Sequence, residues 1–296
     1  MQNFEDLIKE AKTRGKKRIA VAEATDDATI LALKKACQDD MATVFLVGKK
    51  SDIEAKLKQY DFTKGIEDIL DFSNHADIAL NAVKLVSCGK ADMLMKGLIH
   101  TDILLHAVLD KEFGLRTGKI LSHTFVVKVS AYPKLLLITD AAMNIAPSLA
   151  DKKGILQNSI DLATKVGIKN IKAAVLGAVE EVNEKMQATI DAAILSKMAD
   201  RKQIKGALVD GPLAFDNAIS KRAAEEKGIV SQVAGDADIL LVPEIVTGNV
   251  LFKALAYFAD SKLAGVIMGA KAPIILTSRA DTQETKFNSI MWITTS

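Results

Sequence analysis

Short runs of β-branched and aliphatic residues alternate with longer amphipathic stretches along this whole chain. The longer stretches repeat apolar residues at helical spacing, as at Ile30, Leu33 and Ala36. This alternation is typical of an α/β protein in which helices cover both faces of a parallel sheet. The predicted strands are residues 18–22, 43–47, 93–95, 123–128, 135–139, 173–176, 207–209, 239–242, 264–268 and 274–276. The helices expected between them include residues 27–38, 76–87, 148–166 and 184–199.

The length of 296 residues favours two domains, since one domain commonly takes about 150 residues. Two strands that flank Pro133 predict an antiparallel hairpin, which often marks a domain border. We place that border after Lys119, and residues 269–296 are too short to form a domain of their own. The prediction is one α/β domain of residues 1–119 plus 269–296 and a second of residues 120–268.

Composition excludes several classes of protein. The formal net charge of +2 argues against a nucleic-acid arm, and 5% aromatic residues argue against base stacking. Two cysteines without C-x-x-C, and four histidines without i,i+4 spacing, predict neither a disulfide framework nor a zinc site. The charged N-terminus lacks the apolar core of a signal peptide, and no apolar run reaches about 18 residues. We therefore expect a cytoplasmic protein without a metal, a membrane partner or a nucleic-acid partner.

Ligands of open α/β sheets bind beyond the carboxyl ends of the strands, and the sharpest polar motif at such a position is residues 277–286. Ser278 could cap the helix that follows, and Arg279 beside it would offer a forked donor to phosphate. The alternative is an ordinary capping box formed by Ser278 and Asp281, with Arg279 on the surface.

Two further strand ends carry candidate residues. Lys96 and Gly97 precede Thr101, a possible N-cap, in a turn that suits phosphate or that is simply a capped turn. Asp210 follows a predicted strand, and Gly211-Pro212 would aim its carboxylate outward as a base or ligand, although this is also a common turn sequence.

Three long stretches, residues 188–220, 233–243 and 269–281, resemble the phosphate acetyl/butyryltransferase family, and the resemblance extends over essentially the whole chain. Residues 95–98 and 139–147 are similar to its butyryl branch. The resemblance implies a two-domain fold like that of isocitrate and isopropylmalate dehydrogenases, with an active site between the domains and no redox cofactor. It also implies a homo-oligomer, a dimer at least, and a carboxylate (butyrate) kinase that uses the product.

The implied reaction converts butyryl-CoA and phosphate to butyryl phosphate and CoA, so both CoA and phosphate are substrates and no cofactor is expected. The family's Ser-Arg pair matches Ser278, for the oxyanion or the leaving sulfur, and Arg279, for phosphate. The acetyl branch has an Asp where this chain has Thr285, so Asp281 or Glu284 is the expected base, with Asp210 as the alternative. The expected substrate-binding residues are Lys96, Thr101, Arg116, His123, Asn144 and Asp210, with Arg116 and Lys96 assigned to the CoA phosphates.

Three alternatives remain at this stage. The first is the same reaction on acetyl-, propionyl- or branched-chain acyl-CoA. The second is a metal-dependent decarboxylating dehydrogenase, in which Asp140, Asp210 and Asp216 would supply the acids, although neither G-x-G-x-x-G after the first strand nor a P-loop occurs. The third is a domain of this fold that has no catalytic activity.

Overall fold

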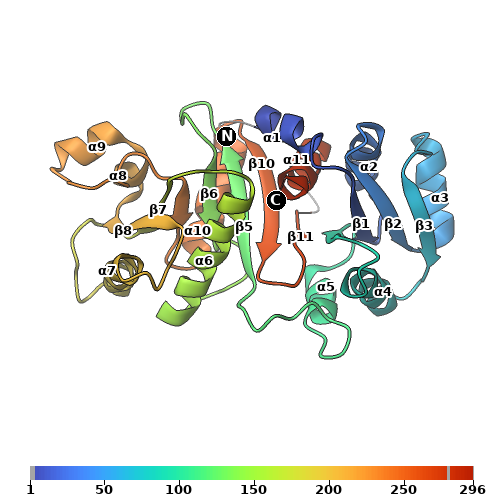
Figure 1. Ribbon diagram of the computed structural model, residues 1–296, viewed down its shortest axis with the longest axis horizontal. Coiled ribbons are helices and arrows are strands. Elements are labelled where there is room, and N and C mark those ends of the chain that lie inside the picture. The colour runs from blue at the N-terminus through green and yellow to red at the C-terminus, as the bar shows by residue number, and fades with distance from the viewer. Residues whose placement is uncertain (1–3, 279–280, 296) are drawn as a thin grey trace. The chain divides into compact units, whose positions relative to one another are not determined.

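The computed structural model describes residues 4–278 and 281–295, and this part of the chain forms two compact units (Figure 1). The inserted unit comprises Ile120–Lys262, and the terminal unit comprises Phe4–Lys119 together with Leu263–Ser296. Compact units need not coincide with domains, so the domain ranges given above stay a prediction.

The terminal unit is an α/β layer structure with neighbouring parallel strands in the order β3-β2-β1-β4-β11, followed by β10 antiparallel to β11. In Figure 1, α1, α2 and α11 lie together on one side of these strands, and α4 and α5 lie together on the other. Its elements are α1 (Phe4–Ala11), β1 (Lys17–Ala22), α2 (Asp27–Gln38), β2 (Ala42–Gly48), α3 (Lys50–Gln59), β3 (Ile66–Asp71), α4 (His75–Ser87), β4 (Met93–Lys96), α5 (Thr101–Val108), β10 (Lys262–Met268), β11 (Ile274–Ile275) and α11 (Gln283–Thr294).

The inserted unit has strands in the order β5-β6-β9-β7-β8, all parallel except β5, which pairs antiparallel with β6. Helices α6 and α7 pack on these strands and on each other. Its elements are β5 (Ser122–Lys128), β6 (Leu136–Thr139), α6 (Leu149–Lys165), β7 (Ile171–Leu176), α7 (Gln187–Asp200), β8 (Ala207–Leu213), α8 (Phe215–Ile219), α9 (Lys221–Glu226), β9 (Ile239–Leu241) and α10 (Ile245–Phe258).

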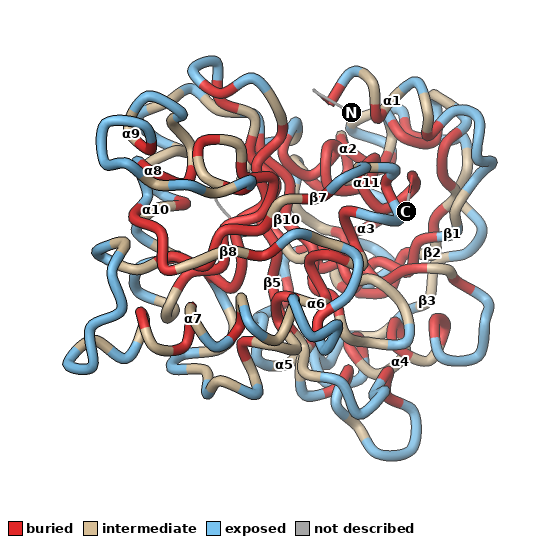
Figure 2. Tube along the Cα trace, turned by 60° about the vertical axis from the view of Figure 1, so that its left-hand side comes forward, coloured by how far each residue is buried: buried red, intermediate tan, exposed pale blue. Residues whose placement is uncertain are grey.

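The core of each unit consists of strands that are buried along most of their length (Figure 2). Strand β4 is buried at all four positions, as expected for a parallel strand with helices on both faces. Helix α11 is buried from Thr285 to Thr294, and it packs against α1 and α2. Its Trp292 is completely buried with its ring 6.5 Å from that of Phe4, and Lys35 of α2 lies over the ring of Phe287.

Most predicted elements are confirmed, including the helix at 27–38 and the hairpin around Pro133. The predicted hairpin accounts for the antiparallel β5, whereas the antiparallel pairing of β10 with β11 was not predicted. Strand β3 was not predicted, because it lies at the edge of its sheet and exposes three of its six residues, so it lacks an apolar run.

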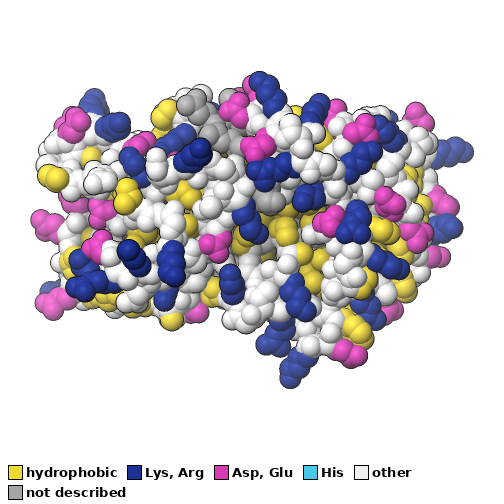
Figure 3. Space-filling model, viewed as in Figure 1, with side chains coloured by type: hydrophobic (Ala, Val, Ile, Leu, Met, Phe, Trp, Pro, Cys, Tyr) yellow, Lys and Arg dark blue, Asp and Glu magenta, His cyan; other side chains and the backbone are white. Residues whose placement is uncertain are grey.

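The surface carries both signs of charge, in keeping with the net charge of +2. On the face drawn in Figure 3, Lys and Arg side chains are interspersed with Asp and Glu side chains. Within the described part of the chain, no helix combines the length and the apolar character needed to cross a membrane.

Candidate functional site

Three neighbouring strands of the terminal unit bring polar residues to one edge. Strands β1, β4 and β11 are adjacent and parallel, so their carboxyl ends lie side by side. Glu23 and Asp26 follow β1, Lys96 ends β4, and Thr277 and Ser278 follow β11. This edge, which we call the β1-β4-β11 edge, therefore combines carboxylates, a lysine and hydroxyl groups.

The ends of β1 and β4 are in direct backbone contact at this edge. The amide of Gly97 donates to the carbonyl of Ala22 at 2.9 Å, and the amide of Leu98 donates to the carbonyl of Glu23 at 2.9 Å. Glu23 adopts a left-handed backbone with φ of 61°, which is uncommon for a residue with a side chain. Lys96 is 3% exposed, and its ammonium donates to the carbonyl of Gly97 at 3.3 Å.

Two residues between β11 and α11, Ser278 and Asp281, are hydrogen-bonded to each other. The amide of Ser278 donates to the carboxylate of Asp281 at 2.6 Å, and the amide of Asp281 returns to the carbonyl of Ser278 at 3.1 Å. The hydroxyl of Thr282 caps α11 by accepting from the amide of Thr285. The predictions of Ser278 as the N-cap and of a capping box between Ser278 and Asp281 are thus wrong, because Thr282 is the N-cap and both residues precede α11.

The structure places the expected base candidates close to Ser278 in the chain and partly open to solvent. Asp281 is half-buried, whereas Ser278 and Glu284, in the first turn of α11, are exposed. Arg279, the expected phosphate ligand, lies outside the described residues.

Lys286 is a residue of this edge that the sequence analysis did not assign. It is 1% exposed, and its ammonium donates to the hydroxyl of Thr277 at 3.1 Å. Burial lowers the pKa of Lys286, and the carboxylates of Asp26 and Asp281 act in the opposite direction. The burial of Lys286 follows from the packing of α11 against α1 and α2, which the sequence of this helix does not reveal.

Two other predicted residues of the terminal unit lie differently. Thr101 is the first residue of α5 rather than its N-cap, which is His100, and the prediction of a capping Thr101 is wrong. Arg116 is exposed in a loop held to the segment between β10 and β11, where the Thr117 hydroxyl donates to the carbonyl of Gly269 at 2.5 Å.

In the inserted unit, Asn144 and His123 lie near the carboxyl end of β6. The carboxylate of Asp140 accepts from the side-chain amide of Asn144 at 2.5 Å, and that amide also donates to the carbonyl of Leu121 at 2.9 Å. His123 is completely buried with its ring against Phe125. The contacts of Asn144 thus hold the segment after β6, whereas the ring of His123 packs within β5.

Asp210 does not lie at a strand end, and that prediction is wrong. Strand β8 continues through Gly211-Pro212 to Leu213, so Asp210 is a half-buried residue within the strand. Its carboxylate accepts from the amide of Gly211 at 2.8 Å. Among the described residues, no three His, Cys, Asp or Glu side chains are grouped so as to hold a metal ion, and this includes Asp140, Asp210 and Asp216.

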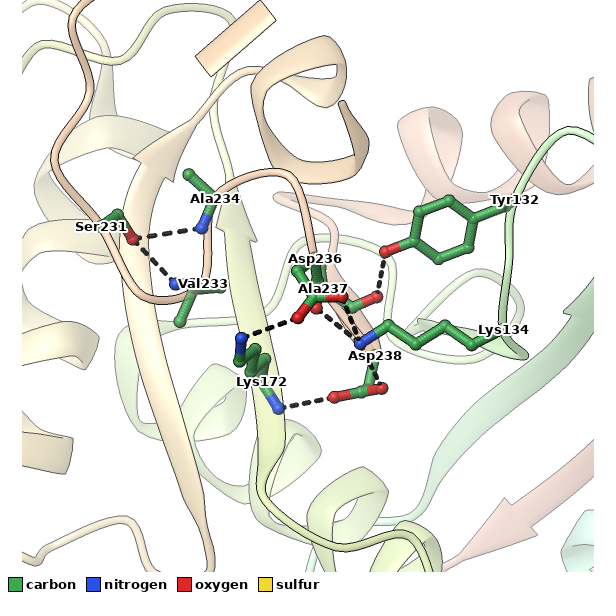
Figure 4. A network of polar contacts seen from close by, with 9 residues as sticks. All are labelled: Tyr132, Lys134, Lys172, Ser231, Val233, Ala234, Asp236, Ala237 and Asp238. Carbon is green, nitrogen blue, oxygen red and sulfur yellow. Dashed lines mark hydrogen bonds and ion pairs between the residues drawn. The ribbon is translucent and has the colours of Figure 1, made fainter. Parts of the chain in front are cut away.

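Figure 4 shows a network of four charged residues at the amino ends of β7 and β9. In the inserted unit this is the edge opposite to the carboxyl ends of these parallel strands. The ammonium of Lys172 contacts Asp236 at 2.7 Å, and that of Lys134 contacts Asp236 at 3.0 Å and Asp238 at 2.8 Å. The Tyr132 hydroxyl donates to the carbonyl of Ala237 at 2.6 Å. These groups are hydrogen-bonded and paired with one another, so the network stabilises the segment before β9.

Comparison with known proteins gives concordant results at the level of sequence and of structure. The family model for phosphate acetyl/butaryl transferase matches residues 3–79 and 63–294. The chain is 47% identical over 289 residues to a phosphate butyryltransferase of Clostridium beijerinckii, covering 98% of this chain and 96% of that protein. It is 44% identical over 281 residues to a phosphate acetyltransferase of Rickettsia felis, covering 95% and 80%. A crystal structure of a branched-chain phosphotransacylase from Enterococcus faecalis V583 matches with a TM-score of 0.84 and 35% identity, covering 94% and 98% of the two chains.

Proposed function

We propose, from the premise that this chain belongs to the phosphate acetyl/butaryl transferase family, that it transfers the butyryl group of butyryl-CoA to phosphate. The products are butyryl phosphate and free CoA, and the reaction is reversible. The observation that carries the proposal is the nearly full-length likeness to a phosphate butyryltransferase.

The reaction has clear chemical demands. A phosphate oxygen attacks the thioester carbonyl carbon, a new C–O bond forms, and the C–S bond breaks with its electron pair leaving on sulfur. Both the phosphate and the developing oxyanion are negatively charged, so they need positive charge or N–H and O–H donors. The β1-β4-β11 edge supports this chemistry, since it combines the exposed Ser278, two lysines and the amino end of α11.

We assign roles at this edge accordingly. Arg279 binds phosphate, and Ser278 stabilises the oxyanion or the leaving sulfur. Asp281 or Glu284 removes the proton of the CoA thiol in the reverse direction. The residues proposed to contact other parts of the substrates are Lys96, Thr101, Arg116, His123, Asn144 and Asp210.

We extend the proposal to the wider setting of the enzyme. The two α/β units, each built on adjacent parallel strands, support a fold like that of isocitrate and isopropylmalate dehydrogenases, used here without a redox cofactor. We also propose that the enzyme is a cytoplasmic homo-oligomer and that a carboxylate kinase consumes the acyl phosphate.

The chain length of the acyl group is the open alternative, because relatives include acetyl and branched-chain enzymes. Each methylene contributes only about 1–3 kcal/mol to discrimination in an apolar pocket. The test is CoA release from acyl-CoAs with two to six carbons, measured with and without phosphate. Phosphate-dependent release that is fastest at four carbons is the expected result, a maximum at two carbons reassigns the substrate, and release without phosphate contradicts the proposal.

A further inference from the structure

Lys286 buries an ammonium group in the core of the terminal unit, in contact with the residue before Ser278. Its side chain extends from the first half of α11, and its ammonium donates to the Thr277 hydroxyl, directly before Ser278. An ammonium has three N–H donors, and Thr277 takes one of them. No carboxylate among the described residues forms an ion pair with Lys286, and Asp26 and Asp281 act on it from further away.

Asp26 shows independently that the polar groups of this edge are incompletely satisfied. One carboxylate oxygen of Asp26 caps α2 by accepting from the amide of Thr29 at 2.9 Å. The other oxygen is buried and has no hydrogen-bond partner in the part of the chain that the structure describes. Buried polar atoms are nearly always paired in native proteins, so this unpaired carboxylate oxygen marks a place where the packing does not satisfy every polar group.

Packing alone does not account for an ammonium in this position. A methionine side chain would fill nearly the same space without the cost of removing a charge from water. The ammonium lies against Thr277, the residue directly before Ser278, and Ser278 is assigned to the oxyanion or the leaving sulfur. Preorganised positive charge of this kind stabilises a transition state more than it stabilises the bound substrate.

We propose that Lys286 is a positioning residue of the transfer reaction, which fixes Thr277 and thereby Ser278 and supplies positive charge beneath them. This inference rests on the proposed function, since it assumes that Ser278 acts on phosphate and thioester. It predicts that the hydroxyl of Thr277 is needed as the connection between the lysine and the reacting groups.

The experiment compares Lys286→Met, Lys286→Arg and Thr277→Val with the unmodified chain, using butyryl-CoA and inorganic phosphate as the varied substrates. The matched control is Lys35→Met, which removes an exposed lysine of α2 that lies over Phe287, the residue after Lys286 in α11. Lys286→Met should lower kcat/KM for phosphate by about tenfold to a hundredfold, the loss typical of a displaced catalytic group. In Lys286→Met, KM for butyryl-CoA should change by less than about twofold. Lys286→Arg should recover part of the lost kcat/KM for phosphate. Thr277→Val should also lower kcat/KM for phosphate, but by less than Lys286→Met.

The outcomes separate this inference from the proposed function. If the unmodified chain releases no CoA with phosphate, the proposed function fails. If it is active and folded Lys286→Met matches it within about twofold, the role of Lys286 is refuted. If Lys286→Met does not fold by circular dichroism, Thr277→Val decides, and normal phosphate kinetics in that variant overturn the inference. A loss in Lys35→Met equal to that in Lys286→Met also overturns it, because the effect would then come from helix packing.

Discussion

Gly97 lies so close to Glu23 that a Cβ atom on Gly97 would be 2.1 Å from the Glu23 carbonyl oxygen. That oxygen accepts the amide of Leu98, and the amide of Gly97 itself bonds Ala22. The absence of a side chain at Gly97 is therefore what allows the ends of β1 and β4 to meet. The placement of Lys96 depends on this contact, because Lys96 is the preceding residue.

Gly97→Ala should accordingly lower both stability and activity. The new methyl group meets backbone atoms that have no rotamer to change, and overpacking of this kind costs about 1–3 kcal/mol. Urea unfolding followed by circular dichroism gives the free energy. Gly118→Ala is the control, because Gly118 has a left-handed φ of 82° but no neighbouring atom within 4 Å. The strained backbone of Gly118→Ala should lower stability by about 1–2 kcal/mol, and its activity should be unchanged. Full activity in Gly97→Ala would contradict the role of this contact.

Arg279→Ala should raise KM for phosphate steeply and lower kcat without changing the fold. The reason is that a guanidinium offers two parallel donors to a phosphate, and alanine offers none. Arg279→Lys should recover only part of the loss, since a lysine cannot form the forked contact. Steady-state kinetics with varied phosphate measure both variants, and near-normal phosphate kinetics in Arg279→Ala would remove it from the site.

Asp281→Asn and Glu284→Gln should differ in which direction of the reaction they slow. The residue that acts as base should lose rate mainly when CoA and acyl phosphate are the substrates, because the thiol proton is removed in that direction. The carboxamide oxygen that Asp281→Asn introduces can still accept the amide of Ser278, so this hydrogen bond is kept in Asp281→Asn. Measuring both directions for both variants identifies the base, and equal, small effects would mean that neither residue has this role.

Asp236→Asn should destabilise the inserted unit in a pH-dependent way. Burial acts to raise the pKa of Asp236, but Lys172 and Lys134 outweigh it and hold this pKa below its ordinary value. The stabilisation is thus present above about pH 4, the ordinary pKa of an aspartate, and is lost as pH falls through the lowered pKa of the folded state.

Unfolding in urea at pH 7 and near pH 3 tests this dependence. The variant should be less stable by about 1 kcal/mol at pH 7, and the difference should shrink at the lower pH. Asp200→Asn is the control, because its ion pair with Lys197 is largely exposed and should contribute little at either pH. A difference between Asp236→Asn and the unmodified chain that stays constant with pH would contradict the role of the carboxylate.

The two cysteines should react with thiol reagents at very different rates. Burial raises the pKa of the Cys37 thiol to about 12, so little thiolate is present at pH 8, whereas Cys88 is exposed. A native thiol titration should show one fast group, which Cys88→Ser removes, and a denatured one should show two. Two fast thiols in the native protein would contradict this prediction. Cys88→Ser should retain activity, and it is then the suitable background for measuring CoA release with such reagents.

The sequence predicted elements well where local signals were strong. Residues 27–38 have apolar spacing and a capping Asp26, and the structure begins and ends α2 at those positions. The predictions from the sequence were less reliable where pairing with a neighbouring strand decides whether a segment is a strand or a turn. Gly211-Pro212 is typical of a turn, yet β8 continues through it, because pairing with β7 extends as far as Leu213. Lys286 went unassigned because its burial follows from the packing of α11, and the contact of Gly97 with Glu23 requires two strands from distant parts of the chain.

The burial of Trp292 makes the terminal unit separately observable by spectroscopy. This is the one tryptophan of the chain, and it lies fully enclosed on α11 beside Phe4. Fluorescence excited near 295 nm therefore reports on the terminal unit alone, whereas far-ultraviolet ellipticity averages over both units. Coincident melting curves from the two signals would mean that the units unfold as one cooperative block, and separated curves would give each unit its own midpoint.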